Sequence, residues 1–172
     1  MSAATAASPA RLAANRNRGQ DSESPRSIAE RIRSNGSVCF RAFGGSMFPW
    51  IRAADIVFAR RCGIEQANIG EVVLFERDGR LFVHRVLRRT SAELGKNFHP
   101  ALITKGDALD GADAPVSRDE FLGRVIRLNR NRRHIDLESF GHVLCGRLLA
   151  YLSPHTSLVY RPVRTIKNLL RA

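Results

Sequence analysis

The sequence lacks the features that mark membrane-spanning, secreted and metal-binding proteins. No window holds the roughly 18 consecutive apolar residues that a membrane span needs, and no apolar core of a secretory signal follows the N-terminus. The three cysteines (Cys39, Cys62 and Cys145) are an odd number at unrelated spacings in apolar-rich surroundings. We therefore expect buried, reduced thiols rather than a disulfide framework or a metal site, and we expect no cofactor. A cytoplasmic or peripherally membrane-associated protein fits these absences.

Acidic residues are also scarce. The chain has 16 Asp and Glu against 28 Lys and Arg, which gives a net charge of +12, and no acid precedes Asp21. Such a surplus favours an anionic partner, either nucleic acid or an acidic membrane face. The arginines are scattered, with concentrations at both ends, so a solvated basic surface fits equally well. We expect no nucleic-acid partner.

The remaining composition is that of one folded domain with appendages. Residues 1–26 are low in aromatic and β-branched residues, which predicts a disordered tail. A short helix is expected at 27–33, and Asp78-Gly79 is a strong hairpin signal between two apolar runs. Short apolar runs predict strands at 37–43, 55–59, 71–76, 81–87, 102–105, 121–128 and 134–137. We therefore expect a mostly β (α+β) domain over 27–138, built as a partly open barrel, with a helical extension over 139–172.

The C-terminal segment has a helical period in two parts. Apolar residues recur at helical spacing from Val143 to Leu152, until Pro154. In residues 160–172 an apolar stripe faces away from four basic residues, Arg161, Arg164, Lys167 and Arg171. This pattern predicts an amphipathic basic helix that lies on an anionic membrane surface. The alternative is a stripe that packs on the protein's own barrel, with its charges solvated.

The turn Gly44-Gly45-Ser46-Met47-Phe48-Pro49 follows the first predicted strand. Two glycines allow a sharp turn, and Pro49 is compatible with the first turn of a helix. A serine at such a strand exit is exposed and lies beside free backbone N–H groups, as an acyl-transfer nucleophile requires. The alternative interpretation is an ordinary loop with packed Met and Phe side chains behind it.

Two further segments supply the other groups of a hydrolytic site. His84 lies on the returning strand of the Asp78-Gly79 hairpin, where a lone histidine is more often structural. The loop over 105–116 carries Asp107, Asp110 and Asp113, and its spacing excludes an EF-hand calcium site. Ser, His and Asp in this order form a potential nucleophile, base and orienting acid.

These residues also carry a resemblance to a known family. Five short motifs stand in the order found in the signal peptidase I superfamily, over about half of the chain: Gly45-Ser46-Met47-x-Pro49, Gly70-Glu71-Val72-Val73, His84-Arg85-Val86, Thr104-Lys105-Gly106-Asp107 with Asp113 beyond, and Gly123-Arg124-Val125. The chain resembles the branch typified by the endoplasmic-reticulum signal peptidase, because His84 stands where bacterial signal peptidases and LexA-type repressors have a lysine base.

The resemblance implies a LexA/signal peptidase-like barrel and a serine endopeptidase. Ser46 would be the nucleophile, His84 the general base, Asp113 the residue that orients the imidazole, and Asp107 the residue that holds the active-site loop. Gly44, Gly45, Ser46 and Met47 would form the oxyanion and substrate-binding turn. The substrate would be a leader or precursor peptide, cut after small residues while it is held as an extended strand.

Two positions depart from the family pattern. Ala54-Asp55 stands in place of the usual Gly-Asp after the serine motif, and Gly44 stands where a serine often supplies a second oxyanion donor. Loss of one such donor typically lowers the rate by about 10²–10³-fold. The alternative function is therefore a catalytically weak or inactive module of the same fold that binds peptides or membranes. The self-cleaving half of a repressor is excluded, because it would need a lysine base and a DNA-binding domain.

Overall fold

The structure is a computed structural model that describes residues 24–94 and 97–152. It is mostly β, with one antiparallel, seven-stranded sheet that does not close on itself and with helices on either side of it. The strands are β1 (Ser37–Arg41), β2 (Ile56–Arg60), β3 (Val72–Arg77), β4 (Arg80–Leu94), β5 (Asn97–Lys105), β6 (Phe121–Arg130) and β7 (Arg133–Asp136). The seven predicted strands are thus confirmed, with shifts at their ends.

Strand β3 shows why the sheet needs cover on both faces. Its side chains alternate between two apolar clusters: Val72 and Leu74 belong to one, and Val73 and Phe75 to the other. Successive side chains of a strand point to opposite faces, so β3 separates the two clusters. The first cluster also contains side chains of α2, β1, β2 and β6, and the second contains side chains of β4 and β5.

The strand order is β1-β2-β6-β3-β4-β5. Strand β6 pairs with β2 along one edge, and with both β3 and β7 along the other, since residues 121–124 face β3 and residues 127–130 face β7. This order places a strand from late in the chain between two from early in the chain. Strands β3 and β4 are therefore linked to β1 and β2 by way of β6, which pairs with both β2 and β3.

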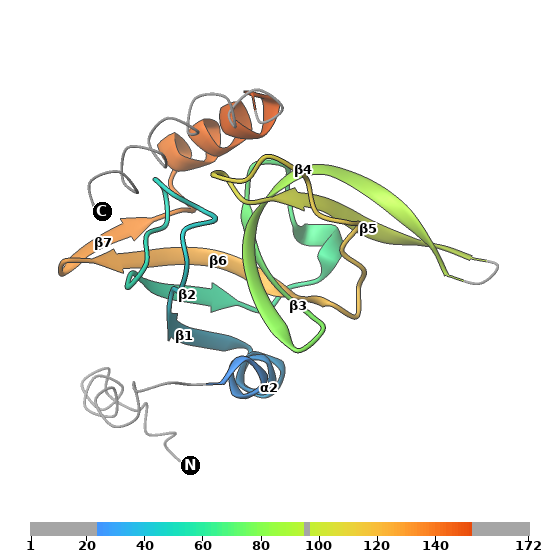
Figure 1. Ribbon diagram of the computed structural model, residues 1–172, viewed down its shortest axis with the longest axis horizontal. Helices are drawn as coiled ribbons and strands as arrows, with labels where there is room; N and C mark the ends of the chain where they lie inside the picture. The colour runs from blue at the N-terminus through green and yellow to red at the C-terminus, as the bar shows by residue number, and fades with distance from the viewer. Residues whose placement is uncertain (1–23, 95–96, 153–172) are drawn as a thin grey trace, which may run out of the picture.

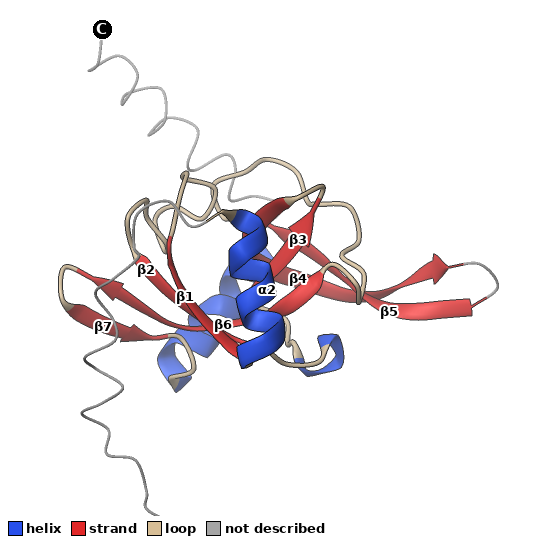
Figure 2. Ribbon diagram, turned by 90° about the horizontal axis from the view of Figure 1, so that it is seen from below, coloured by secondary structure: helices blue, strands red, loops and turns tan. Residues whose placement is uncertain are grey.

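Two helices lie on opposite sides of the strands (Figures 1 and 2). Helix α2 (Pro25–Asn35) begins with a Ser24 side-chain cap and Pro25 in its first turn, and it ends at Gly36, whose φ of 73° suits glycine. It begins inside the segment assigned to the tail by sequence. Residues 140–152 form the second helix, as predicted. The rest of the predicted tails, 1–23 and 153–172 with the basic stripe, lies outside the described residues.

Strand β4 is longer than predicted, because it continues to Leu94 and forms a hairpin with β5 that projects from the rest of the molecule (Figure 1). Residues 88–91 are all exposed. Residues 101–103, their partners on β5, are buried, but residues 88–91 are themselves polar or charged, so no alternation of apolar and polar residues marks them as a strand. The prediction of a strand ending at Leu87 was wrong for this reason.

The second helix packs closely on the loop before β3. A Cβ atom on Gly146 would lie 2.5 Å from the Gly70 carbonyl oxygen, and one on Gly70 would lie 2.5 Å from the Arg147 nitrogen. Only glycine at both positions permits this approach. Of the described helices, none is long and apolar enough to cross a bilayer.

The three cysteines are free thiols, but they are not all buried as expected. Cys39 and Cys62 are half-buried, and Cys145 is exposed. Cys145 lies on the helix of residues 140–152, whose buried side faces Gly70 through Gly146 and Ala150. The apolar residues next to Cys145 in the sequence lie on both the buried and the exposed face of that helix. Their presence therefore does not indicate that Cys145 is buried.

Candidate active site

Ser46 lies in a turn between β1 and β2, not at the start of a helix. Residues 46–50 form consecutive turns, and the Phe48–Pro49 peptide bond is cis. Ser46 thus lies in a turn after the first strand, as expected, and Pro49 does not begin a helix. Gly44 has a φ of 77°, a conformation that a serine seldom adopts. This backbone accounts for glycine at position 44.

Asp55 anchors the far end of the serine turn. The buried carboxylate accepts hydrogen bonds from the Arg130 guanidinium and from the Arg52 backbone N–H at 2.8 Å, and Arg130 also donates to the Trp50 carbonyl. Burial alone would raise the pKa of Asp55, but the Arg130 and Arg52 hydrogen bonds outweigh it and lower that pKa below its ordinary value. Ala54 has a φ of 73°, so the Ala54-Asp55 turn keeps the left-handed backbone that glycine would favour.

His84 is held from one side by Asp113. The imidazole is buried, with 3% exposure, and its Nδ1 lies 2.7 Å from Asp113 Oδ2. The same carboxylate oxygen accepts a hydrogen bond from Thr104 Oγ1 at 2.6 Å, and the Asp113 backbone N–H donates to the Thr104 carbonyl. Because a carboxylate oxygen is an acceptor, the neutral ring carries its proton on Nδ1 and leaves Nε2 as a free base. The pairing with Asp113, rather than Asp110, is the contact that the motif spacing predicts.

Two aromatic rings complete the setting of His84. The ring of Phe75 and that of Phe82 lie edge-on to the imidazole, with centroids 5.9 and 5.8 Å away, and they stack on one another at 5.2 Å. Both phenylalanines are on the β3–β4 hairpin with His84. The two phenylalanine rings therefore restrict the orientation of the imidazole, and the backbone of β4 sets its position along the strand.

The loop after β5 contacts the backbone of the serine turn directly. The Ala108 N–H donates to the Ser46 carbonyl at 2.8 Å, and a Cβ atom on Gly106 would lie 2.7 Å from that same oxygen. Lys105, just before this glycine, is 3% exposed, and burial lowers the pKa of its ammonium although Asp107 and Asp110 oppose this effect. The Lys-Gly-Asp motif thus supports the carbonyl of Ser46.

Asp107 is joined to the strand that carries His84. Arg85 Nε and Nη2 donate to the two Asp107 carboxylate oxygens at 2.8 and 2.7 Å, and Arg85 Nη1 donates to the Gly70 carbonyl at 2.7 Å. Both side chains of this bidentate pair are buried. Arg85 was not singled out by sequence. The available signal was its alternation with His84 on β4, because an arginine that faces a core needs a buried acid.

Ser46 and His84 line the same pocket, of about 290 Å³. Its walls come from the start of α2, the end of β1, the serine turn and residues 80–84 of β4, and they include the apolar side chains of Phe40, Met47 and Leu81. The described residues show no hydrogen bond between Ser46 and His84. Such contacts are often long before a substrate binds.

Backbone donors are available beside Ser46. Among described residues, none accepts a hydrogen bond from the N–H of Gly45, Ser46 or Met47, whereas the Phe48 N–H donates to the Gly45 carbonyl. Ser46 is half-buried and Met47 is fully buried. The turn therefore offers backbone N–H groups that could donate to an oxygen atom of a ligand.

No protein-family profile, curated protein or solved structure matches this chain.

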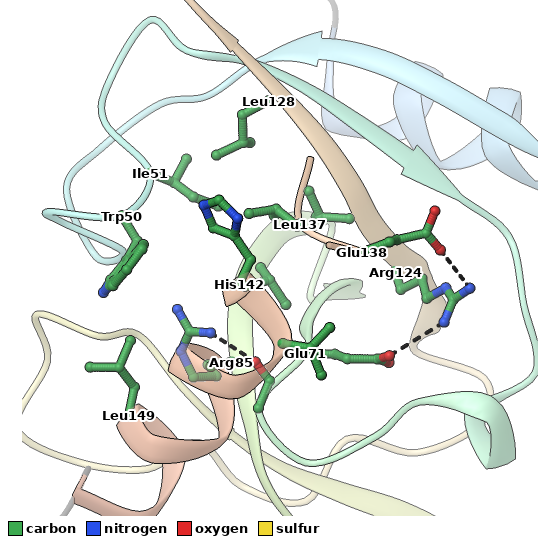
Figure 3. Close-up of a pocket in the computed structure, with 15 residues that line it drawn as sticks. Trp50, Ile51, Glu71, Arg85, Arg124, Leu128, Leu137, Glu138, His142 and Leu149 are labelled. Carbon is green, nitrogen blue, oxygen red and sulfur yellow. Dashed lines mark hydrogen bonds and ion pairs between the residues drawn. The ribbon is translucent and has the colours of Figure 1, made fainter. Parts of the chain in front are cut away.

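A second pocket, of about 220 Å³, lies between the sheet and the helix of residues 140–152 (Figure 3). Three of its charged groups are mutually paired: Arg124 bonds Glu71 at 3.3 Å and Glu138 at 2.7 Å. Arg85 and Trp50 also line it, whereas Ser46 and His84 do not. Over residues 24–94 and 97–152, no group of three His, Cys, Asp or Glu side chains is placed to hold a metal ion.

Proposed function

We propose that this protein is a serine endopeptidase with the partly open barrel of the signal peptidase I superfamily, in its histidine-base branch. The observation that carries the proposal is the hydrogen bond between His84 Nδ1 and Asp113, made by a histidine that shares a pocket with Ser46. A merely structural histidine needs a partner for its ring, but it does not need a half-buried serine and free backbone donors in the same pocket.

The proposed reaction is acyl transfer in two steps. Ser46 Oγ attacks the scissile carbonyl while His84 Nε2 takes the hydroxyl proton, and Asp113 stabilises the imidazolium through Nδ1–H. The Ser46 N–H, with that of Gly45, stabilises the oxyanion. Nε2–H then protonates the leaving amine as the C–N bond breaks, which leaves an acyl-serine. Water, deprotonated by His84, hydrolyses this ester and restores the Ser46 hydroxyl.

The substrate would lie along an open strand edge. Strand β5 pairs with β4 only from Arg85 onward, so in the described part of the chain no strand covers the outer edge of residues 80–84. These five residues all line the pocket that contains Ser46. An extended peptide added to this edge would pass between His84 and the serine turn. A leader or precursor peptide with small residues at the cleavage point remains the proposed substrate.

The membrane is the proposed second partner. Large apolar side chains are exposed at helical spacing on the described part of the C-terminal helix: Phe140 (84%), Leu144 (58%), Leu148 (58%) and Tyr151 (83%). In the sequence the four basic residues of 160–172 follow this stripe. Aromatic and aliphatic side chains next to arginines suit the interface of an anionic bilayer, so we propose that this end of the chain holds the enzyme near membrane-bound precursors.

The competing function is a peptide-binding module without catalysis. Reaction with a serine-directed phosphonate separates the two, because only an activated serine is phosphonylated. We expect the wild type to be labelled at Ser46, and we expect Ser46→Ala and His84→Gln to lose labelling. Ser91→Ala, at an exposed position on the projecting arm, is the matched control. Peptide binding without labelling of Ser46 at any pH would favour the binding module.

A further inference from the structure

We propose that the groove around Ser46 and His84 selects peptides that carry a carboxylate side chain about four residues from the cleavage point. This inference rests on the proposed function for its substrate class, since it assumes that an extended peptide occupies the groove. It concerns the charge of that peptide, which the catalytic residues do not determine.

All the acidic or basic side chains that line this groove, apart from His84, are arginines. They are Arg41, Arg52 and Arg80, and no aspartate or glutamate lines the pocket with them. The three come from separate elements: the end of β1, the turn before β2 and the start of β4. Positive charge therefore stands on both walls of the groove and not on one helix or loop.

These arginines differ from the others that pack on the sheet. Arg77, Arg124 and Arg130 each have a carboxylate partner. In the described part of the chain, Arg41 and Arg80 form no ion pair or side-chain hydrogen bond. The Arg52 guanidinium has a 3.5 Å contact to the Pro49 carbonyl and lies 6.0 Å from the centroid of the Phe48 ring, and its charge also helps to lower the pKa of Asp55. All three are exposed. The charges of Arg41 and Arg80 are thus available to a ligand.

The strand register places one arginine at a defined distance from the chemistry. Arg80, Phe82 and His84 alternate along β4 and share one face of the strand. Four residues of extended chain span about 13 Å. A peptide that lies along the edge of β4 would therefore bring a side chain about four residues from the scissile bond next to Arg80. Asp78, in the hairpin turn, is the acid nearest to Arg80 in sequence, and the two form no ion pair.

Exposed ion pairs are individually weak, so the effect is a preference and not an absolute requirement. Each contact should change affinity by about 5-fold at low ionic strength and by less at high salt. The apolar floor formed by Phe40, Met47 and Leu81 would hold the small and aliphatic side chains between the charged ends. The expected ligand is thus an extended peptide with a small or apolar centre and an acidic flank.

The test uses full-length protein with Ser46→Ala, so that binding is measured without turnover. Three fluorescein-labelled peptides share a centre of small residues and carry Glu, Gln or Lys at the position four residues away. We expect the Glu peptide to bind about 5-fold more tightly than the Gln peptide, and the Lys peptide to bind most weakly. Arg80→Gln should abolish this order, and Arg80→Glu should reverse it. Arg133→Gln, at an exposed site on β7, should leave it unchanged.

The outcomes distinguish this inference from the proposed function. Equal affinity for the three peptides, an equal loss in Arg133→Gln, or no binding of any peptide would overturn the inference. Displacement of the Glu peptide by a single-stranded oligonucleotide of equal charge, at lower concentration than by unlabelled peptide, would also overturn it. Phosphonate labelling of Ser46 does not depend on peptide charge, so it reports on the peptidase proposal whichever way the binding experiment turns out.

Discussion

Gly106 and Ser46 are in backbone contact, so close that a single added methyl group would separate them. A Cβ atom on Gly106 would lie 2.7 Å from the Ser46 carbonyl oxygen and 2.9 Å from the Leu109 side chain. The Ala108 N–H holds the same carbonyl at 2.8 Å. The position of the proposed nucleophile therefore depends on a loop 60 residues later in the chain.

The first prediction concerns this contact. Gly106→Ala should displace the serine turn and lower the rate of phosphonate labelling at Ser46 by about 10²-fold. It should also destabilise the fold by about 1–3 kcal/mol, measured by urea denaturation. Gly111→Ala is the control, because no atom lies within 4 Å of a Cβ added there. Equal labelling rates for the two variants would show that the loop does not position Ser46.

The second prediction concerns the orienting acid. Asp113→Asn places an amide donor near His84 Nδ1 and favours the tautomer with its proton on Nε2, which cannot act as a base. Labelling of Ser46 should fall by about 10²–10⁴-fold with little loss of stability. Asp110→Asn, at an exposed position in the same loop, should have no effect. A damaging Asp110→Asn beside a silent Asp113→Asn would reverse our assignment.

The third prediction concerns the buried pair behind the site. Asp107→Asn leaves the Arg85 guanidinium without its charge partner in a buried setting, and it should destabilise the protein by about 3–5 kcal/mol. Glu30→Gln removes one partner of the exposed Arg26–Glu30 pair, and it should cost about 0.5 kcal/mol or less. Urea denaturation of both variants provides the comparison. Similar stabilities would mean that solvent reaches the Arg85–Asp107 pair.

The fourth prediction concerns acid stability. The pKa of Asp55 is lower in the folded chain than in the unfolded one, where it is about 3.9. This carboxylate therefore contributes stability above about pH 4, and the contribution is lost as the pH falls through the lower, folded pKa. In Asp55→Asn, urea midpoints should be lower at neutral pH and should fall less steeply in acid. Part of the pH dependence of stability should remain in this variant, because the hydrogen bond from Arg77 also lowers the pKa of Glu120. Asp119→Asn, at an exposed position, should match the wild-type curve.

The fifth prediction concerns the membrane. Full-length protein should sediment with anionic vesicles and not with neutral ones, and added salt should release it. A chain that ends at Pro154 should stay in the supernatant. Leu148→Ser, within the exposed stripe of the described helix, should weaken binding without loss of peptide affinity. If both chain lengths stay in the supernatant with anionic vesicles, this segment does not bind membranes.

The sequence predicts the local elements of this fold well. Alternating apolar residues locate β3, the Asp78-Gly79 pair locates its hairpin with φ angles of 51° and 69°, and Gly36 ends α2. Each of these signals arises within a few residues of chain. Sequence could not show that β6 lies between β2 and β3, because strand pairing depends on contacts between residues some 50 to 70 positions apart.

The residues of the candidate site could be proposed from the sequence, but the contacts that hold them in place could not. The pairing of His84 with Asp113 follows from family-like spacing, and the structure places these groups in contact. The buried ion pair between Arg85 and Asp107, and the positive φ of Gly44, result from the tertiary fold. The gathering of Arg41, Arg52 and Arg80 in one groove could not be predicted either, because in the sequence they are part of a general surplus of basic residues.

The projecting hairpin of β4 and β5 divides the proposed machinery into two pieces of chain (Figure 1). Ser46 and His84 precede its turn, and Gly106, Asp107 and Asp113 follow it. The protein is therefore suited to fragment complementation: two polypeptides broken at this turn would each be inert, and their reassembly would be reported by labelling of Ser46. The same position would accept an inserted domain whose own ligand then controls the reactivity proposed for Ser46.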